Sequence, residues 1–402
     1  MHIKQLTVQG VRNLGSQTLE PAPQINLFAG PNGSGKTSIL EAIHLLGRGR
    51  SFRSRSIKAV INVAEDVGQC TVFGLLAGKP KDGEEGSAGL PVGVSRETKG
   101  GFRFKVNGEL VHTASALAEV LPLVLINTES FQLLAGGPQN RRRYLDWGLF
   151  HTHPAFRELW RQQQRVLQQR NALLKRGKGG HLAELDWWDE QFADLSEQIT
   201  LLRREYLETI APLVAEILQR LSPIPEISFS YSQGWDSSKD LKETLKAGRD
   251  RDIITGSSQH GPHRADVRVR CRQQNAAEVL SRGQTKSLVM AMMMAQGVHY
   301  RAQNDRPSVF LIDDLPAELD MEQQKNVAVL IAEMGCQTFI TGTDAEQLLA
   351  PWRAIGWTDM NMHINTEAAA KGSVEAGNGQ QNRTLKVFHV KHGEVLSGEA
   401  RV

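Results

Sequence analysis

Residues 30–37 read GPNGSGKT, and they stand between two stretches of different pattern. Before them, residues 24–29 (QINLFA) form a short apolar run that predicts a strand. From residue 36, the segment KTSILEAIHLLG repeats apolar side chains at steps of three and four, which predicts a helix that ends at Gly47. A glycine-rich loop between a strand and a helix matches the phosphate-binding pattern G-x-x-x-x-G-K-[ST].

The residue types of this loop suit a nucleoside triphosphate. Gly30, Gly33 and Gly35 let backbone amides approach phosphate oxygens without Cβ clashes, and the following helix N-terminus adds its positive dipole. We expect Lys36 to bridge the β- and γ-phosphates and Thr37 to bind Mg²⁺ through its hydroxyl. A structural glycine turn is the alternative, and the flanking strand and helix disfavour it. The loop therefore predicts ATP and Mg²⁺ as cofactors.

A second acidic motif follows a short apolar run at residues 309–314 (VFLIDD). Ionised Asp side chains are rarely tolerated at the end of a buried strand unless they are paired or bind a metal. We expect Asp313 to hold Mg²⁺ through water and Asp314 to orient or deprotonate an attacking water. A strand that ends in a solvated turn is the alternative.

Residues 280–288 (LSRGQTKSL) lead into a helix whose Leu288, Met292 and Ala295 share one face. Ser281 stands at the N-cap position, so free backbone amides and a hydroxyl would point outward from a helix N-terminus. This arrangement suits a phosphate, although a plain helix cap is the simpler interpretation of the segment alone.

The rest of the chain predicts an α/β protein with an inserted helical lobe. Apolar residues recur at helical spacing through most of residues 139–221, whereas strand and helix patterns alternate before and after. We expect four parts. They are an ATPase lobe with a β-rich subdomain at 1–138, the helical lobe at 139–225, a second ATPase lobe at 226–366, and a linker with a final strand at 367–402.

Bulk composition gives weaker information. The chain has 402 residues and a net charge of +3, so a nucleic-acid partner would have to be recognised by local charge clusters. Cys70, Cys271 and Cys336 lie far apart and form no disulfide framework, as expected for a reduced cytosolic protein. No stretch resembles a signal peptide or membrane span, so we expect a soluble, cytoplasmic protein with no membrane partner.

Positive charge does cluster after the glycine-rich loop. Between Ala42 and Ala64 there is no acidic residue, and five cations alternate with serines and Phe52. These candidate DNA-binding residues are Arg48, Arg50, Arg53, Arg55 and Lys58, which we call the arginine strip. Arg141 to Arg143 are a second candidate, and a solvated charged face is the alternative for both clusters. A metal site that includes His260, His263 and Asp266 is conceivable but lacks a third soft ligand.

The motifs also occur in a recognisable order. They begin with VRNLGSQTLE at Val11 and end at Asp320. Between these points, in chain order, stand GPNGSGKTSILEAI, GRSFR, GGPQNRRRYLDW, GPHRADVRVR, LSRGQTK and LIDDLPAELD. In this order the chain resembles ABC-type ATPases and, among them, the RecF family of bacterial recombination mediators, which are related to the heads of SMC-like proteins.

The resemblance implies a fold and a set of roles. The fold is an SMC-like ABC-type ATPase head with an inserted helical lobe. The implied nucleotide-binding residues are Arg12, Asn13, Gly30, Pro31, Asn32, Gly33, Ser34, Gly35, Lys36, Thr37 and Thr341, with Ser281, Arg282, Gly283 and Gln284 acting on the nucleotide of a second copy. Glu318 to Asp320 would join the two sites of the dimer.

The resemblance also implies a function in DNA repair and replication, including gap repair and SOS induction. DNA, as gapped DNA or single-strand/double-strand junctions, and the proteins RecO and RecR would be partners of an ATP-dependent homodimer associated with the nucleoid. Transporter ATPases usually have Glu where this chain has the shorter Asp314, so we expect a weak, DNA-stimulated ATPase. They also have a histidine after the next strand, where Thr341 to Thr343 read TGT. The ATPase subunit of a membrane transporter is the alternative, which the helical insert and the arginine strip disfavour.

Overall fold

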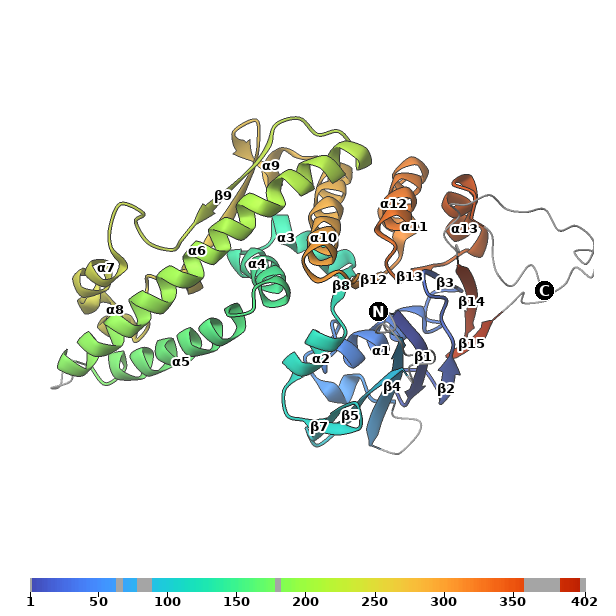
Figure 1. The fold of residues 1–402 in the computed structure, drawn as a ribbon, viewed down its shortest axis with the longest axis horizontal. Helices are drawn as coiled ribbons and strands as arrows, with labels where there is room; N and C mark the ends of the chain where they lie inside the picture. The colour runs from blue at the N-terminus through green and yellow to red at the C-terminus, as the bar shows by residue number, and fades with distance from the viewer. Residues whose placement is uncertain (1, 63–67, 78–88, 178–181, 358–383, 398–402) are drawn as a thin grey trace, which may run out of the picture. The chain divides into compact units, whose positions relative to one another are not determined.

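The computed structural model describes residues 2–62, 68–77, 89–177, 182–357 and 384–397 (Figure 1). The chain divides into two compact units, Met1–Thr128 with Asn304–Val402, and Glu129–Gln303. We call them the first and second unit and describe each by itself. The four-part division expected from the sequence stays a prediction, and its linker lies, up to residue 383, outside the described residues.

The first unit contains an antiparallel sheet in the strand order β2-β1-β4-β5-β6-β7. Its strands are β1 (His2–Gln9), β2 (Gln17–Leu19), β4 (Gln69–Ala77), β5 (Leu90–Glu97), β6 (Phe102–Val106) and β7 (Glu109–Val111). The turn between β6 and β7 is Asn107-Gly108, and both residues have positive φ, as this hairpin signal predicts.

The second sheet of this unit has the order β15-β14-β3-β13-β12-β8 and is parallel except for β15. Its strands are β3 (Ile25–Ala29), β8 (Leu123–Ile126), β12 (Val309–Ile312), β13 (Thr338–Gly342), β14 (Leu385–Lys391) and β15 (Glu394–Ser397). Both β3 and β12 are buried along their whole length, which explains their continuous apolar runs. Because the strands are parallel, the residues that follow β3, β12 and β13 meet at one edge.

Helices cover the faces of this second sheet. Helix α1 (Lys36–Arg48) contacts β13 and also β4 and β5 of the antiparallel sheet, so one apolar core joins both sheets through α1. Figure 1 shows α11 (Leu315–Glu318), α12 (Met321–Met334) and α13 (Ala345–Ala354) on the other side of the sheet. The short helices η1 (Ile57–Ala59) and α2 (Ala114–Val120) complete the unit, with η2 (Thr128–Phe131) at its boundary.

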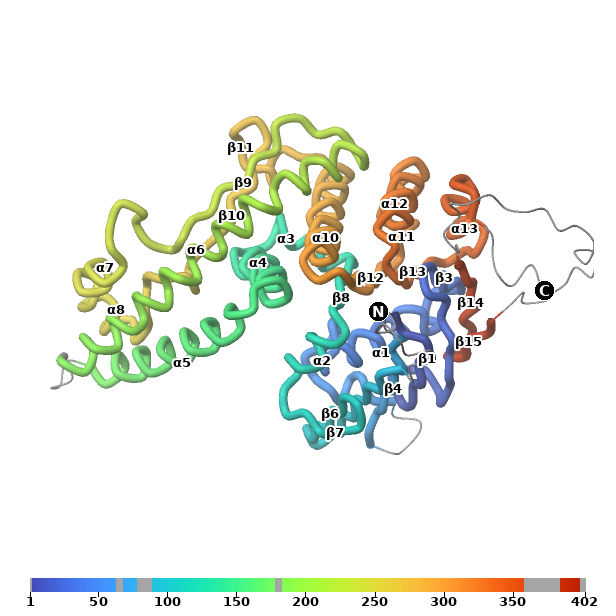
Figure 2. The backbone as a smooth tube through the Cα atoms, in the orientation of Figure 1, coloured from blue at the N-terminus to red at the C-terminus, as the bar shows by residue number. Residues whose placement is uncertain are grey.

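The second unit is mainly helical, as the sequence predicts for residues 139–221. Helices α4 (Pro138–Thr152), α5 (Phe156–Leu174) and α6 (Leu182–Leu221) form its body, and α5 lies alongside α6 in both backbone views (Figures 1 and 2). A three-stranded antiparallel sheet, in the order β11-β10-β9, packs on α4 and α6. Its strands are β9 (Ile227–Ser232), β10 (Asp266–Cys271) and β11 (Gln274–Asn275).

Shorter helices and α10 complete this unit. They are α3 (Gln132–Ala135), α7 (Leu241–Ala247), α8 (Arg249–Thr255), η3 (Pro262–Arg264), α9 (Ala276–Val279) and α10 (Arg282–Asn304), whose last residue belongs to the first unit. The face of α10 that carries Leu288, Met292 and Ala295 is buried, as predicted. In the described part of the chain, no helix combines the length and the apolar character needed to cross a bilayer.

Candidate functional site

The glycine-rich loop joins the end of β3 to the start of α1 and depends on its glycines. Gly33 and Gly35 have φ of 79° and 117°, a region that L side chains rarely adopt. A Cβ on Gly30 would lie 2.2 Å from the carbonyl oxygen of Val390. The first turn of α1 contains no acidic residue, so no side chain of that turn competes with a phosphate for its free amides and dipole.

Lys36 lies within this loop. Its Nζ donates hydrogen bonds to the carbonyl oxygens of Gly30, at 2.7 Å, and Pro31, at 2.9 Å. Burial lowers the pKa of Lys36, and the nearby carboxylates of Asp314 and Asp313 oppose this shift. The amine is therefore held at the centre of the loop by groups that a phosphate could replace.

Asp313 joins three elements. Its Oδ1 accepts a hydrogen bond from the Thr37 hydroxyl of α1, at 3.0 Å, and from the Thr341 hydroxyl of β13, at 2.7 Å. The backbone amide of Asp314 donates to Thr341 Oγ1 at 2.8 Å. Burial and the adjacent charge of Asp313 raise the pKa of Asp314, and Lys36 opposes this rise. The side chains predicted to hold Mg²⁺ and water thus lie beside the loop.

Arg12 and Asn13 reach the same region from the end of β1. Asn13 accepts a hydrogen bond from Ser38 at 3.0 Å and donates to the Gly33 carbonyl at 3.2 Å. Arg12 makes a bidentate ion pair, with both distances 2.8 Å, to the fully buried carboxylate of Glu41. Glu41 also accepts from Ser51, so α1 ties Arg12 to the start of the arginine strip.

These residues surround one cavity of about 660 Å³ in the first unit. Ten of the predicted nucleotide-site residues line it, namely Arg12, Asn13, Asn32, Gly33, Gly35, Lys36, Thr37, Asp313, Asp314 and Thr341. Sequence reasoning assigned no role to Ser38, Asn62 and Thr128, which also line it. Ser38 lies within the motif that contains the loop, whereas Asn62 and Thr128 lie outside every motif. The structure therefore brings motifs from residues 12 to 341 together.

The cavity fits a phosphate-bearing ligand and its cation. The buried hydroxyl of Ser34 has no hydrogen-bond partner among the described residues, which leaves it available to a phosphate oxygen. Thr37 and Asp313 offer the hard oxygen atoms that Mg²⁺ prefers. Within the described ranges, no group of three or more His, Cys, Asp or Glu side chains could hold a metal alone.

The arginine strip is divided by the structure. Arg50, Arg53, Arg55 and Lys58 are exposed, whereas Arg48 is half-buried, and burial lowers its pKa to about 10. Arg53 lines the nucleotide cavity, and its Nη1 lies 3.8 Å from Glu41 Oε2. The role of the strip in DNA binding stays a prediction, and Arg53 is better placed to act at the cavity.

The second unit contains the segment that begins at Ser281. Ser281 Oγ accepts from the Gln284 amide at 3.3 Å, and Gln284 Oε1 accepts from the Ser281 amide at 3.0 Å, which forms a capping box. Ser281, Arg282 and Gly283 are exposed. The segment is thus a helix cap in this structure, and its predicted action on the nucleotide of another copy stays a prediction.

The second candidate DNA-binding cluster and the conceivable metal site both contain residues that contact other parts of the protein. Arg141 pairs with Asp266, at 2.7 Å, and donates to three carbonyls near the end of α3, while Arg142 donates to the Ala265 carbonyl at 2.6 Å. Arg143 is exposed. Nε2 of His263 lies 2.9 Å from the Ser258 carbonyl, and burial lowers the pKa of His263 to about 4. These contacts give Arg141, Arg142 and His263 a structural role within the second unit.

A C-terminal contact with the loop was not expected. The turn between β14 and β15 brings the Gly393 amide to the Ser34 carbonyl, at 2.8 Å. A Cβ on Gly393 would lie 2.0 Å from the Asn13 carbonyl oxygen, and Gln17 donates to the Gly393 carbonyl at 3.2 Å. We call this turn the C-terminal brace, because it supports the phosphate loop and Asn13 from behind.

Comparison with known proteins agrees with this geometry. Residues 2–365 match the family model described as the RecF/RecN/SMC N terminal domain. The DNA replication and repair protein RecF of Pseudomonas aeruginosa PAO1 is 40% identical over 98% of this chain and 97% of its own length. The chain belongs to the RecF family. A second RecF-family member, from Pseudomonas paraeruginosa PA7, is 43% identical over the same shares.

Solved structures confirm the ABC-type ATPase head. A structure described as the recombination mediator protein RecF with ATP in the RecFOR pathway has a TM-score of 0.78 and 24% identity, over 98% of this chain and 97% of that chain. An Smc head bound to the C-winged helix domain of ScpA has a TM-score of 0.57 and 16% identity, over 100% of this chain and 98% of that chain. Membership of the RecF family gives the transporter alternative no support.

Proposed function

We propose that this RecF-family protein is an ATP-dependent, DNA-binding recombination mediator in DNA replication and repair, with roles in gap repair and SOS induction. The observation that carries the proposal is the meeting of Lys36, Thr37, Asp313 and Thr341 at one cavity in a chain with RecF relatives at 40–43% identity. The nucleotide is ATP, in keeping with the ABC-type family.

Lys36 and the loop bind the triphosphate. The Lys36 amine exchanges the carbonyls of Gly30 and Pro31 for phosphate oxygens, and its charge compensates theirs. The amides at the start of α1 and the Ser34 hydroxyl supply further donors. When bound, Mg²⁺ neutralises phosphate charge, and Thr37 and Asp313 hold it, the latter through water.

Asp314 orients or deprotonates the water that attacks the γ-phosphate. Its raised pKa makes the carboxylate a better proton acceptor than an exposed Asp. Its side chain is one methylene shorter than the Glu of transporter ATPases, so the carboxylate reaches less far. We infer slow hydrolysis, which DNA accelerates.

Dimerisation supplies the groups that the cavity lacks. Ser281, Arg282 and Gly283 are exposed at the start of α10, and in our proposal they contact the γ-phosphate bound by a second copy. ATP is then held between two chains, and hydrolysis releases them. Glu318 to Asp320 join the two sites.

DNA binding is assigned to the exposed members of the arginine strip that lie outside the nucleotide cavity. Arg50, Arg55 and Lys58 are free to contact phosphates, while Arg53 and the Ser51–Glu41–Arg12 chain of contacts reach the nucleotide cavity. This contact path gives DNA and ATP a physical route to influence each other. RecO and RecR are the proposed protein partners, at gapped DNA or strand junctions in the nucleoid.

The test is the mass of the protein in solution at micromolar concentration, with ATP or ADP and with or without duplex DNA. The unchanged protein should form a dimer with ATP and DNA, and remain a monomer with ADP. Lys36→Met should abolish both ATP binding and the dimer, because it removes the cation that compensates phosphate charge.

A matched variant separates nucleotide binding from dimerisation. Ser281→Arg should keep ATP binding, because Ser281 lies outside the residues that line the cavity, yet it should block the dimer. A protein that stays monomeric with both ATP and DNA would overturn the proposal.

A further inference from the structure

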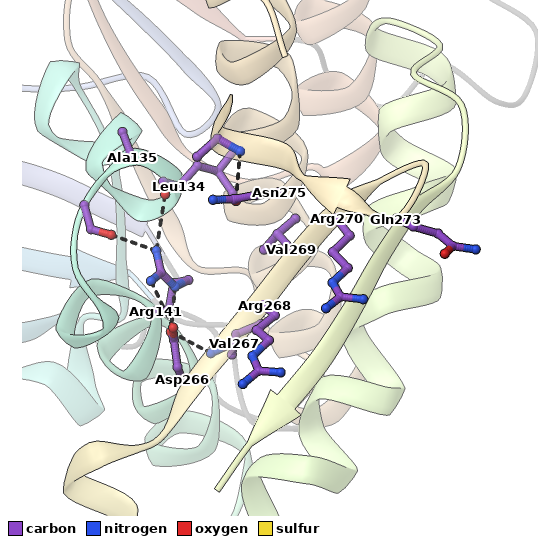
Figure 3. Close-up of a pocket in the computed structure, with 12 residues that line it drawn as sticks. Leu134, Ala135, Arg141, Asp266, Val267, Arg268, Val269, Arg270, Gln273 and Asn275 are labelled. Carbon is purple, nitrogen blue, oxygen red and sulfur yellow. Dashed lines mark hydrogen bonds and ion pairs between the residues drawn. The ribbon is translucent and has the colours of Figure 1, made fainter. Parts of the chain in front are cut away.

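The sheet of the second unit exposes a row of cations that no motif assigned. Along β10, Val267, Val269 and Cys271 are buried, whereas Arg268 and Arg270 are exposed and alternate with them. Figure 3 shows both arginines projecting from the same side of the strand. Successive residues on one face of a strand are about 7 Å apart, so the two guanidinium groups form a short positive row.

The strand paired with β10 contributes hydroxyl groups to this face. Arg268 lies opposite Ser230, and Arg270 lies opposite Ser228. Both serines are exposed. The outward face of the sheet therefore combines arginine and serine side chains, both of which commonly donate hydrogen bonds to DNA phosphates.

The charges of Arg268 and Arg270 are not neutralised within the described part of the chain, where neither guanidinium has an ion pair or hydrogen bond. Two arginines near the same sheet do have ion-pair partners, since Arg141 pairs with Asp266 and Arg203 with Asp146. The nearby carboxylates are engaged as well, since Asp266 is held by Arg141 and Glu278 accepts from Asn275. The two free cations thus face solvent.

A groove of about 410 Å³ runs beside this row (Figure 3). Strand β11 pairs only with Arg270 and Cys271, so the first part of β10 has an open edge. Gly136, Arg141, Gln273 and Asn275 line the groove together with Arg268 and Arg270. Its wall also contains the Asp266 carboxylate, whose charge is compensated by its ion pair with the Arg141 guanidinium.

The chemistry of this face favours a phosphate backbone over a folded protein partner. The outward side chains of β9 and β10 are serines, Arg268, Arg270 and Asp266, whose charge is paired with Arg141. Protein interfaces combine arginine with aromatic anchors at their centres, and none of these outward side chains is aromatic. DNA is a regular polyanion that needs no apolar anchor. We propose that the outward face of the β9–β10 sheet, through Arg268 and Arg270, is a second DNA-phosphate contact surface of this protein.

This proposal rests on the proposed function, since it presumes that the protein binds DNA. It adds a contact in the second unit that is independent of the arginine strip in the first unit. Two such surfaces explain how one chain could neutralise more phosphates than the strip alone can reach.

The experiment measures binding of the full chain, with ATP and Mg²⁺, to a labelled DNA duplex over a series of salt concentrations. Arg268→Ala/Arg270→Ala should weaken binding roughly tenfold at low salt and reduce the slope of log K against log[salt] by about two, one for each phosphate contact. Arg268→Lys/Arg270→Lys should keep the slope, because it retains both charges. Arg165→Ala/Arg251→Ala, which removes two exposed charges elsewhere in the unit, should match the unchanged protein.

The possible results distinguish a failure of the proposed β9–β10 surface from a failure of the proposed DNA-binding function. A wild-type slope and affinity in Arg268→Ala/Arg270→Ala would overturn the surface alone, whereas no DNA binding by the unchanged protein would overturn both. Retained DNA binding with loss of poly-glutamate binding in the same variant would assign the face to an acidic protein instead. Equal melting temperatures of all four proteins exclude a folding defect, and an equal loss in the Arg165 and Arg251 control would also overturn the surface.

Discussion

Asp314 combines an unusual backbone conformation with a perturbed carboxyl group. Its φ of 55° and ψ of 49° lie in the left-handed region, which Asp tolerates better than most residues. The Thr341 hydroxyl holds the Asp314 amide, and burial next to Asp313 raises the Asp314 pKa. The residue is therefore fixed beside the phosphate loop in a setting that suits proton transfer.

Replacing Asp314 by Asn should trap the ATP-bound dimer. Loss of a general base typically slows a reaction about 10²- to 10⁴-fold, and the amide of Asn cannot accept the proton. ATP turnover and mass in solution would measure the effect. Asp344→Asn is a matched control, because Asp344 is the N-cap of α13 and Asn caps helices equally well. Unchanged turnover in Asp314→Asn would show that another group activates the water.

His44 predicts how the stability of the first unit depends on pH. Its Nδ1 lies 2.7 Å from the Arg50 carbonyl, and burial lowers the pKa of His44 to about 3. Between pH 3 and the ordinary value near 6.5, the unfolded chain binds more protons, so stability falls as the pH falls. At pH 5 the loss from this residue should be about 2 kcal/mol.

Denaturant unfolding at pH 7 and pH 5 would test this dependence. His44→Gln should show a smaller loss between the two pH values, by about 2 kcal/mol, because its amide can donate to the same carbonyl without titrating. An equal loss in both proteins would mean that His44 does not carry the effect.

At the scale of elements, the sequence predicted those strands, loops and helices that depend on the spacing of neighbouring residues. The strand at 25–29, the glycine-rich loop and the helix from Lys36 followed from residue spacing and are confirmed. The glycine that closes the helix was predicted two residues too early, since α1 continues through Gly47 to Arg48 and its C-cap is Gly49. Gly47 lies inside the helix at a point of close packing, where a Cβ would lie 2.7 Å from Leu123 Cδ1. Close packing requires this glycine, and sequence alone cannot distinguish that need from a helix stop.

The sequence also did not indicate which distant residues contact each other. The sequence marked Arg141 as a possible DNA contact, yet the structure pairs it with Asp266, a distant residue of β10. Composition shows that a charge exists but not which long-range neighbour neutralises it. For the same reason the C-terminal brace had no signal, because Gly393 meets Ser34 only through the pairing of β14 with β3.

The C-terminal brace predicts that one added methyl group, at Gly393, lowers the affinity for ATP. Gly393→Ala places a Cβ against the Asn13 carbonyl and in a backbone conformation, φ of 83°, that Ala rarely adopts. ATP affinity, measured by calorimetry, should fall about tenfold or more as the loop shifts. Gly108→Ala also has positive φ, of 81°, but open space around it, so it should cost some stability and leave ATP affinity unchanged. Equal ATP affinities in both variants would contradict the brace.

At the scale of the molecule, each unit has its own means of stabilisation. The first has a core shared by two sheets, whereas the second contains a buried ionic network. Arg170 of α5, which is fully buried, pairs with Asp189 of α6, at 2.6 Å, and Asp252 of α8, at 2.8 Å. A buried network of this kind is costly to break from one side, because the partners keep their charges without compensation.

Arg170→Met should therefore destabilise the second unit by about 3–5 kcal/mol. ATP affinity should be retained, because every residue that lines the nucleotide cavity belongs to the first unit. Hydrogen exchange of α5 and α6 and ATP titration would measure the two effects. Arg161→Met, which breaks an exposed pair with Glu158, should change stability by less than about 1 kcal/mol. A parallel loss of ATP affinity in Arg170→Met would show that the units are energetically coupled.

The C-terminal brace also bears on biosynthesis. Chains emerge from the ribosome with the N-terminal part first, and domains generally fold as units as they are completed. The phosphate loop is made early, whereas the strand beside β3 and the glycine that supports Ser34 are made after the whole second unit. A growing chain would therefore have its motifs before it has a finished binding site. Competence for ATP would be gained only when translation has reached the final hairpin.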